Sequence, residues 1–238
     1  MKPESYWEEA GRIGYANQYY ISDTVGSYLT RRIGSLAIEA AKQLKLTEES
    51  SVLDLGCGDG TFANGVLARH FKRVKGADLS EAGISRAKAN APRSDVHFEV
   101  CDLRNADLRQ LGSYDAVFLI GILHHVKSHA PRILSELRRV TPRLVVMEPN
   151  GGHIVRKLLE YTPSYRAAGE ESFRTRELES IFAKLGFQKA SWLRFNLFPN
   201  FTPLPLFKLM LPLQPYIERS TWLRALCTAN IWGLTADA

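Results

Sequence analysis

Cysteine is scarce in this chain of 238 residues. The three present, Cys57, Cys101 and Cys227, are odd in number and lack the spacing of a metal site or a disulfide framework. Cysteine near the end of a buried strand commonly packs as a small apolar group, which we expect of Cys57 and Cys101. The amino terminus lacks the charged and apolar regions of a signal peptide, so we expect a cytoplasmic protein.

Charge of one sign is not concentrated anywhere. The formal net charge of +6 and the isoelectric point near 9.3 are mildly basic, but no block of five or more like charges occurs. We therefore expect no nucleic-acid partner and a scattered, solvated basic surface; a patch for an anionic substrate or a lipid is the alternative. Hydrophobic residues at 45% and charged residues at 24% are ordinary for a globular chain with one sizeable core.

The most informative segment is VLDLGCGDGT, residues 52–61. An apolar run long enough for one buried strand is followed by glycines at alternating positions, Gly56, Gly58 and Gly60. Glycine at this spacing lets the backbone turn sharply and leaves no β-carbon between the loop and a ligand. A helix-compatible stretch, residues 62–71, comes next. The end of the strand and the start of the helix would therefore form a crevice of nucleotide size.

The third glycine of the dinucleotide-binding pattern G-x-G-x-x-G is missing, because Thr61 stands in its place. This argues against a nicotinamide cofactor. A second short apolar run ends at Asp78, where a carboxylate can accept hydrogen bonds from both hydroxyls of a ribose. A third run ends at Asp102, and a fourth, residues 114–120, opens with an acid at Asp115.

With these segments in this order, the chain resembles the class I S-adenosylmethionine-dependent methyltransferases. The matching pieces are DLGCGDG (54–60), GADLS (76–80), CDL (101–103), YDAVFLIGILHHV (114–126) and LVVMEPN (144–150). The resemblance implies an α/β, Rossmann-like, doubly wound sheet of seven strands with the last strand antiparallel. It also implies a single methyltransferase domain over residues 1–238, with the cofactor-binding core at 50–150.

The resemblance implies S-adenosylmethionine as the cofactor and a role for each matched residue. The three glycines would let the backbone approach the methionine and ribose portions. Asp54 would support the loop or bind the amino group through water. Asp78 would bind the ribose hydroxyls, and Leu79 would pack on the adenine. The alternative role for such an aspartate is a helix cap or a turn former.

Four further residues follow from the same resemblance. Asp102 would accept a hydrogen bond from the exocyclic amine of adenine, and Leu103 would provide a backbone contact there. Ile120 and Gly121, at the end of the fourth strand, would lie beside the methionine part.

Candidate bases follow the fourth and fifth strands, where such folds place their sites. They are His124, His125, His129, Glu148 and His153. A histidine that titrates near neutrality can take a proton from a hydroxyl or an ammonium group. We select His124, His125 and Glu148 as catalytic candidates. The spacing of the histidines matches no metal-ligand motif, so we expect no metal site.

Each catalytic candidate has an alternative. The family often carries a histidine at the position matching His125, in members with different substrates, which favours a structural or cofactor-side role there. His124 is the candidate that would face the substrate. Glu148 could bind a substrate amine or hydroxyl, or it could cap a helix over residues 151–160.

Helices and strands alternate from about Thr24 to Ala190, which is typical of a parallel sheet covered on both faces. Apolar spacing predicts helices over 24–45, over 80–90 with Ser80 as cap, over 130–140, and from residue 175 to a stop at Gly186. A sixth strand is predicted at 187–195 and a seventh at 225–236.

An aromatic segment, residues 5–23, precedes this pattern. By resemblance, such segments fold over cofactor and substrate, so we predict helices and a lid in residues 1–45, with Tyr15, Tyr19 and Tyr20 in contact with the substrate. The alternative is that Trp7 and the tyrosines anchor a helix to the core.

A second unusual segment, residues 196–224, is inserted where many relatives have only a hairpin between the last two strands. It contains five prolines and is densely apolar, and its proline-free pieces are too short to span a bilayer. Three roles stay open: a cap over a hydrophobic substrate pocket, a homodimer interface, or a membrane-surface contact flanked by Lys208, Arg219 and Arg224.

We therefore expect an enzyme that transfers a methyl group from S-adenosylmethionine, by in-line displacement, to an O or N atom of a small, partly hydrophobic acceptor. A natural product, a quinone-like ring and a lipid-linked sugar are the examples considered. One alternative is a nucleic-acid methyltransferase, although LHHV stands where base-flipping amino methylases carry Asn-Pro-Pro-aromatic. Another is a protein that binds the cofactor without catalysis.

Overall fold

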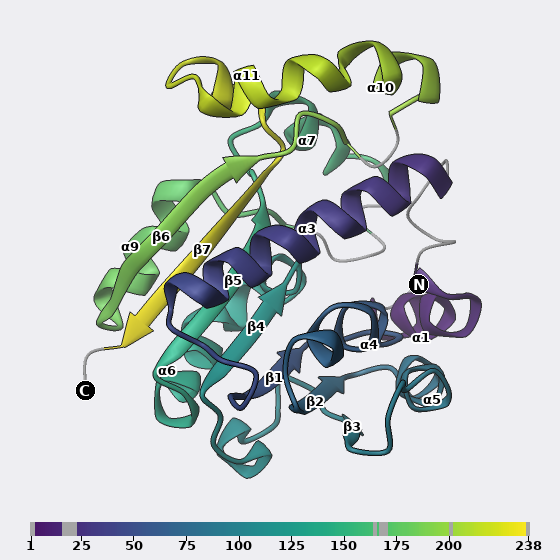
Figure 1. Ribbon diagram of the computed structural model, residues 1–238, viewed down its shortest axis with the longest axis vertical. Helices are drawn as coiled ribbons and strands as arrows, with labels where there is room; N and C mark the ends of the chain where they lie inside the picture. The colour runs from purple at the N-terminus through teal and green to yellow at the C-terminus, as the bar shows by residue number, and fades with distance from the viewer. Residues whose placement is uncertain (1–2, 16–22, 164–165, 167–170, 200–201, 237–238) are drawn as a thin grey trace.

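The computed structural model describes residues 3–15, 23–163, 166, 171–199 and 202–236. Its centre is a seven-stranded sheet in the order β3-β2-β1-β4-β5-β7-β6 (Figure 1). The strands are β1 (Ser51–Leu55), β2 (Arg73–Asp78), β3 (Val96–Val100), β4 (Ala116–Ile120), β5 (Arg143–Pro149), β6 (Phe187–Phe195) and β7 (Ala229–Ala236). Strands β1 to β5 are parallel, and β7 runs antiparallel to β5 and β6. The expected sheet, with its last strand antiparallel, is confirmed.

The central strands are apolar because helices cover both faces of the sheet. Val52 pairs with Val74 on one side, and Leu53 pairs with Val117 on the other. This register brings the carboxyl ends of β1, β2 and β4 to one edge of the sheet, so the segments that follow these strands meet there.

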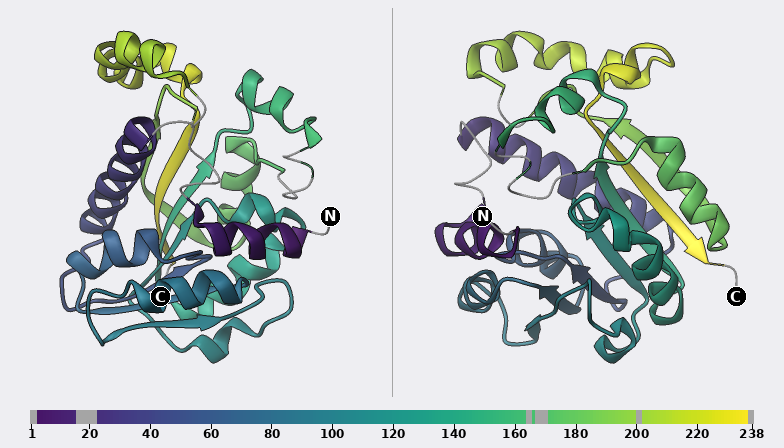
Figure 2. Two further views of the ribbon diagram at one scale, coloured as in Figure 1. Left: turned by 90° about the vertical axis from the view of Figure 1, so that its right-hand side faces the viewer. Right: turned by 180° about the vertical axis from the view of Figure 1, so that it is seen from behind.

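Two layers of helices enclose the sheet (Figure 2). Helices α3 (Asp23–Gln43), α4 (Thr61–Gly65) and α5 (Glu81–Ala89) pack on one face together with Val52, and α6 (Ala130–Val140) and α9 (Thr175–Lys184) pack on the other with Leu53. Neighbouring strand residues contact opposite layers because successive side chains of a strand point to opposite faces.

The capping groups confirm the predicted helix boundaries. Ser80 caps α5, and its Oγ accepts a hydrogen bond from the Gly83 amide at 2.9 Å. Pro131 lies in the first turn of α6, where its missing N–H is not needed. Gly186 follows α9 at a φ of 75°, a left-handed position that ends helices.

Two elements differ from their predicted lengths. The helix expected over 62–71 is divided into α4 and a 3-10 turn, η1 (Leu67–Arg69), because Val66 leaves the helical region at a φ of −120°. The low helix propensity of Gly65 favours a break at this point. The last strand begins at Ala229 rather than at residue 225, since residues 223–226 form the 3-10 turn η6.

The inserted segment lies between β6 and β7, as expected. It contains α10 (Leu204–Met210), η5 (Leu211–Leu213), α11 (Gln214–Arg219) and η6 (Leu223–Leu226). Figure 1 shows α10 and α11 across the top of the molecule, beyond the carboxyl ends of the parallel strands. Phe207 of α10 packs in a cluster with Val25 and Leu29 of α3. No helix in the described part of the chain is long and apolar enough to cross a membrane.

The first helix, α1 (Pro3–Ile13), is held against the amino end of α5. The carboxylate of Glu8 accepts hydrogen bonds from the Ser80 hydroxyl at 2.8 Å and from the Ala82 amide at 3.0 Å. An acidic side chain is stabilised at a helix amino terminus by the exposed N–H groups and the helix dipole. This contact places α1 beside the glycine-rich loop.

Candidate active site

A cavity of about 630 Å³ opens at the edge of the sheet where the parallel strands end. Its lining includes nine of the ten residues that the sequence predicted for the cofactor: Asp54, Gly56, Gly58, Asp78, Leu79, Asp102, Leu103, Ile120 and Gly121. Gly60 is not among the lining residues, and instead caps α4 at a φ of 77°. His124, His125 and Tyr15 also line the cavity, and Glu148 lies behind it.

The glycine-rich loop turns sharply at two lining positions. Gly56 has a φ of 82° and Gly58 a φ of 56°, a region that side chains other than glycine rarely adopt. A β-carbon on Gly56 would lie 2.4 Å from Ile122, and one on Gly58 would lie 3.1 Å from the Tyr15 ring. The loop therefore requires glycine for its conformation and for its close neighbours.

Asp78 joins the second strand to this loop. Its Oδ2 accepts a hydrogen bond from the Gly58 amide and its Oδ1 one from the Ser80 amide, both at 2.9 Å. Burial raises the pKa of Asp78, and these backbone N–H groups oppose the shift because they stabilise the ionised carboxylate. Leu79 follows it in the cavity wall.

Asp54 carries an unsatisfied polar atom. The side chain is buried, and its Oδ2 has no hydrogen-bond partner among the described residues. Burial and the neighbouring Asp78 raise the pKa of Asp54 to about 8. A buried carboxylate oxygen without a partner is costly, so this atom fits a donor supplied by a ligand.

Asp102 is engaged by an arginine that the sequence reading missed. Arg104 donates from Nε to Oδ1 at 2.9 Å and from Nη2 to Oδ2 at 3.0 Å, and it also contacts Glu4 of α1. These hydrogen bonds lower the pKa of Asp102. Arg104 lines the same cavity, so it is a site residue in its own right. The Leu103 carbonyl accepts a hydrogen bond from Arg132.

His124 and Glu148 form a buried hydrogen-bonded pair. Nδ1 of His124 lies 2.7 Å from Oε2 of Glu148, whose two oxygens also accept from the Leu123 amide at 2.8 Å and the His124 amide at 3.2 Å. Glu148 thus supports the 3-10 turn η3 (Leu123–His125). It does not cap α7 (Ile154–Leu159), so that alternative is wrong; the residue at the start of α7 is His153.

The same burial acts in opposite directions on the two pKa values. It raises the pKa of Glu148 to about 8, against the effect of the amides of Leu123 and His124. Burial and the nearby charge of Arg156 lower the pKa of His124, so its imidazole is neutral at pH 7. A neutral imidazole has one nitrogen that can accept a proton, and the state of Glu148 decides which one it is.

The His124 ring lies where the fourth strand ends. Its Cε1 would lie 3.8 Å from a β-carbon built on Gly121, a cavity residue with a φ of 70°. The Gly121 amide donates to the Met147 carbonyl at 2.7 Å, which ties the ends of β4 and β5 together. Ile120 precedes it in the wall.

His125 contacts the amino-terminal helix. The centre of its ring lies 4.4 Å from that of Trp7, and 3.9 Å from that of His124. Burial lowers the pKa of His125, and its Nδ1 has no partner among the described residues. Trp7 also stacks on Tyr15 with ring centres 6.0 Å apart. These aromatic contacts place the segment around Trp7 and Tyr15 over one side of the cavity; Tyr19 and Tyr20 lie outside the described residues.

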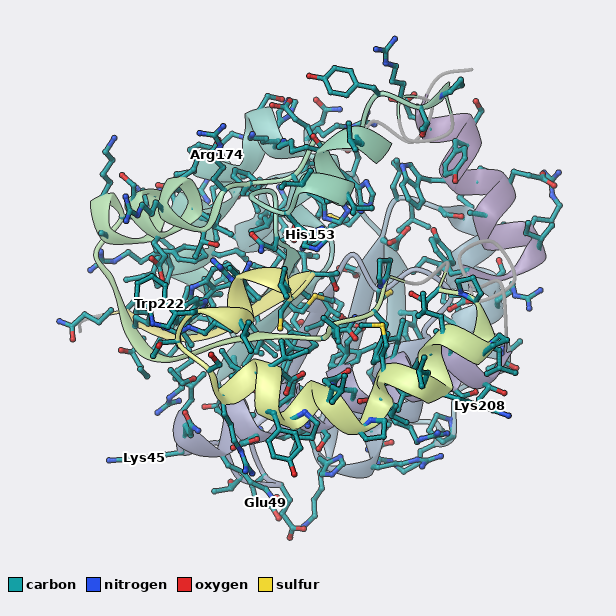
Figure 3. All side chains as sticks on the ribbon, turned by 90° about the horizontal axis from the view of Figure 1, so that it is seen from above. Lys45, Glu49, His153, Arg174, Lys208 and Trp222 are labelled. Carbon is teal, nitrogen blue, oxygen red and sulfur yellow. The ribbon has the colours of Figure 1, made fainter. Side chains whose placement is uncertain are left out.

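The opposite side of the cavity is mostly apolar; the sequence had pointed to it only through His153, a candidate base, and through the possible role of residues 196–224 as a cap. It is formed by α3, by the start of the inserted segment and by the start of α7, through Leu29, Ile33, Phe195, Asn196, Phe198, Pro199, His153, Val155 and Arg156. Figure 3 looks onto this end of the molecule, with His153 near its centre. In the described ranges, no three His, Cys, Asp or Glu side chains are grouped as a metal site requires.

Comparison with known proteins also identifies the core of this chain as a methyltransferase domain. Residues 52–143 match the family described as a methyltransferase domain. The ubiquinone biosynthesis O-methyltransferase of Hydrogenovibrio crunogenus is 26% identical over 140 residues, which are 58% of this chain and 52% of that protein. The chain therefore spans about half the length of this relative. An S-adenosyl-L-methionine-dependent Diels-Alderase of Talaromyces variabilis is 27% identical over 193 residues, 75% of this chain and 63% of that protein.

A solved structure shares the fold. The magnesium protoporphyrin IX methyltransferase of Synechocystis PCC 6803, with bound S-adenosylhomocysteine, superposes with a TM-score of 0.59 at 16% identity, covering 90% of this chain and 84% of that one. The sheet order, the glycine-rich loop with its partner Asp78 and the matched domain agree with one another. These findings support assignment of the chain to the class I S-adenosylmethionine-dependent methyltransferases, with residues 52–143 as the matched methyltransferase domain.

Proposed function

We propose that this protein transfers a methyl group from S-adenosylmethionine to an oxygen or nitrogen atom of a small, partly apolar acceptor, with His124 as the base. The observation that carries the proposal is the buried pair of His124 and Glu148 at the cavity wall, 2.7 Å apart and adjacent to the end of β4. When bound, S-adenosylmethionine supplies an electrophilic methyl group on a sulfonium leaving group.

The residues around the glycine-rich loop fit this cofactor. Gly56 and Gly58 would allow the sharp turn that brings the backbone of the loop to the cofactor. Asp78 has lone pairs left for the ribose hydroxyls after its two amide contacts. Oδ2 of Asp54 would accept from the amino group. Asp102, with Arg104 bound to it, would define the adenine end.

His124 would take the proton that the acceptor loses. Its lowered pKa keeps the imidazole neutral, and a neutral imidazole can act as a base when its proton is on the nitrogen that faces away from the acceptor. Glu148 holds Nδ1, so in its ionised form it retains the proton there and leaves Nε2 as the accepting nitrogen. Glu148 is therefore a positioning residue, because it acts through His124.

The cavity wall favours an acceptor with an apolar part. Leu29, Ile33, Phe195 and Phe198 line the side opposite the glycine-rich loop, and Arg156 and His153 supply polar groups there. The names of the relatives are consistent with such a ligand, since one specifies ubiquinone biosynthesis and another a porphyrin. Trp7 and Tyr15 would keep water from the reacting atoms.

The proposal can be tested with S-adenosylmethionine that carries a trideuterated methyl group. The purified protein is incubated with this cofactor and either a panel of phenols, quinols and prenylated sugars or an organic extract of the source cells, and labelled products are identified by mass spectrometry. We expect label on an amphipathic product with the wild-type protein. The variant His124→Ala should bind S-adenosylhomocysteine normally and give little label, because only the base is missing.

Two results would contradict the proposal. Equal labelling by the wild type and His124→Ala would show that His124 is not the base. Conversion of an acceptor to a rearranged product without label, while the cofactor stays intact, would instead place the chain with relatives such as the Diels-Alderase of Talaromyces variabilis.

A further inference from the structure

One of the inserted helices, α11, has an unusual distribution of side chains. A surface helix normally turns its apolar side chains inward and its polar ones to solvent. In α11 the inward positions are polar: Gln214 donates to the Tyr28 hydroxyl at 2.8 Å, and Glu218 accepts from Arg32 of α3 at 2.6 Å. The exposed side chains here include two large apolar ones, Leu213 directly before α11 and Tyr216 within it, beside the charged Arg219. The segment is thus anchored to α3 by hydrogen bonds and presents an apolar side to the outside.

This apolar side continues along the inserted segment. Leu209 of α10 is 74% exposed, and Trp222, which precedes η6, is 87% exposed. Monomeric soluble proteins rarely expose contiguous apolar side chains of this size unless they mark an interaction site. Figure 3 shows Trp222 at one end of the segment and Lys208 at the other, on the end of the molecule where α10 and α11 lie nearest the viewer.

Helix α7 has the same character and lies at the same end of the molecule. Ile154 is 77% exposed, and Leu158 is exposed as well. Both views in Figure 2 place α7 and the inserted helices beyond the carboxyl ends of the parallel strands. The cavity reaches α7 and the start of the inserted segment, since its lining includes Val155 and Arg156 of α7 and Pro199 of the insertion. We call the exposed side chains of Ile154, Leu158, Leu209, Leu213, Tyr216 and Trp222 the apolar rim.

The charges around the apolar rim have one sign. The segments 154–166 and 202–226 contain six basic and two acidic residues. Both acids are turned away from solvent: Glu218 is bound to Arg32 and to the Asn196 amide, and Glu160 is bound to Lys157 and to the Ser172 amide. Lys208 and Arg219 are exposed beside the apolar side chains. The described part of these segments therefore exposes cations and no carboxylate.

We infer that the apolar rim docks on the surface of a bilayer that contains anionic phospholipid. Apolar side chains beside lysine and arginine are the combination that binds at the headgroup boundary. Tryptophan and tyrosine favour the same depth, because their rings have an apolar body and a polar edge. Trp222 and Tyr216 supply these rings, and Lys208 and Arg219 supply the attraction to lipid phosphates.

A second copy of the chain fits this surface less well. In a symmetric dimer through the apolar rim, each surface would face itself, so that the exposed Lys208 and Arg219 of one copy would approach the cations of the other without a carboxylate between them. Unpaired like charges that lose solvent oppose association. An anionic lipid surface provides the complementary charge.

Docking in this orientation has a consequence for the acceptor. The cavity borders α7 and the start of the inserted segment, the two elements that carry the apolar rim, so docking in this orientation would bring the cavity close to the bilayer. If the proposed methyl transfer holds, on which this step rests, the acceptor class is an amphiphile whose apolar part stays in the bilayer while its reactive hydroxyl or amine reaches His124.

The experiment is co-sedimentation of the full chain with two kinds of vesicle. One contains phosphatidylcholine alone, and the other contains about 30 mol% phosphatidylglycerol. We expect binding to the anionic vesicles that decreases as salt is added, since salt screens charge. The double variants Leu209→Ser/Trp222→Ser and Lys208→Glu/Arg219→Glu should each reduce partitioning about tenfold or more.

Matched variants control for the substitutions themselves. Val100→Ser removes an exposed apolar side chain from the edge strand β3, and Lys45→Glu/Lys88→Glu reverses two exposed charges outside the inserted segment and α7. Both should bind vesicles as the wild type does. Titration with S-adenosylhomocysteine in the same preparations reports on the cofactor site separately, so vesicle binding without cofactor binding would support the docking and reject the proposed methyl transfer.

Two outcomes would overturn the docking. The first is a protein that binds S-adenosylhomocysteine but sediments with neither vesicle. The second is a dimer in light scattering that Leu209→Ser/Trp222→Ser converts to a monomer, because the apolar rim would then be a contact between copies of this chain.

Discussion

The amide of Gly58 donates a hydrogen bond of 2.9 Å to Oδ2 of Asp78, joining the loop after the first strand to the end of the second. The other oxygen of Asp78 accepts from the Ser80 amide at the start of α5. One carboxylate therefore sets the position of the glycine-rich loop and of the next helix relative to each other. Any ligand bound between them depends on this side chain twice, directly and through the loop.

Replacement of Asp78 by Asn should weaken cofactor binding more than it weakens the fold. The asparagine side chain has the same shape, but its NH₂ group would replace an oxygen that accepts from a backbone N–H in the wild type. The unpaired N–H should lower the free energy of unfolding by about 1 to 3 kcal/mol. The loss of charge-assisted bonds to the ribose should lower the affinity for S-adenosylhomocysteine by about 10- to 100-fold. Calorimetric titration measures the affinity and urea denaturation the stability. Asp107→Asn, at the partly buried cap of η2 (Leu108–Leu111), is the control. Unchanged affinity in Asp78→Asn would show that Asp78 does not bind the ribose.

Two glycines near this loop should respond oppositely to the same substitution. Gly56→Ala introduces a β-carbon at a φ of 82° and 2.4 Å from Ile122, so it should lower the free energy of unfolding by about 2 to 5 kcal/mol and impair cofactor binding. Gly65→Ala, in α4, meets no atom within 4 Å and should stabilise the protein by up to about 1 kcal/mol. Urea denaturation of both variants checks the pair, and a similar effect of the two would contradict the loop geometry.

The core of the site was predictable because local sequence determines it. A strand, a turn that needs glycine and an acid at the next strand end are readable in residues 52–78, and parallel strands bring them to one edge. Arg104 was not recognised, because its position in the cavity wall and its contact with Glu4, 100 residues away in sequence, come from the fold; only its bond to Asp102 is local. Short-range pattern carries no information about such a contact.

The roles of Glu148 and of the insertion needed the structure for a similar reason. Sequence left Glu148 open between a substrate contact and a helix cap, whereas its partners are His124 and the amide of Leu123 from a different strand end. The insertion was correctly located between the last two strands, but its apolar side chains divide between the cavity and the exterior. Phe198 lines the cavity and Trp222 does not, and composition alone cannot make that division.

The pair of His124 and Glu148 predicts a distinctive pH dependence of turnover. The imidazole is neutral over the working range because its pKa is lowered. The pKa of Glu148 is raised to about 8, so below this pH its carboxyl group is protonated and donates to Nδ1 of His124. The proton of the neutral ring is then on Nε2, and this nitrogen cannot accept a proton from the acceptor. The kcat should therefore rise as the pH increases and level off above about 8.

The variant Glu148→Gln isolates this effect. The amide should donate to Nδ1 at every pH, so kcat should fall by about 100-fold and lose the rise with pH, while the affinity for S-adenosylhomocysteine stays close to that of the wild type. His97→Gln, on the exposed edge of β3, serves as the control. A merely structural role for Glu148 would lower cofactor affinity and kcat together and preserve the shape of the pH profile.

The raised pKa of Asp54 predicts that cofactor binding releases a proton. Burial and Asp78 raise the pKa of Asp54 to about 8, so at pH 7 the folded chain holds a proton that the unfolded chain has lost. The free energy of unfolding should therefore fall as the pH rises from about 4 to about 8. A bound ammonium group beside Oδ2 favours the ionised form, so binding of S-adenosylhomocysteine should expel this proton and strengthen as the pH rises toward 8. Calorimetry at pH 7 in phosphate and in Tris detects the release as a difference in heat. Asp54→Asn should abolish the difference, and equal heats in the wild type would mean that Asp54 does not hold the amino group.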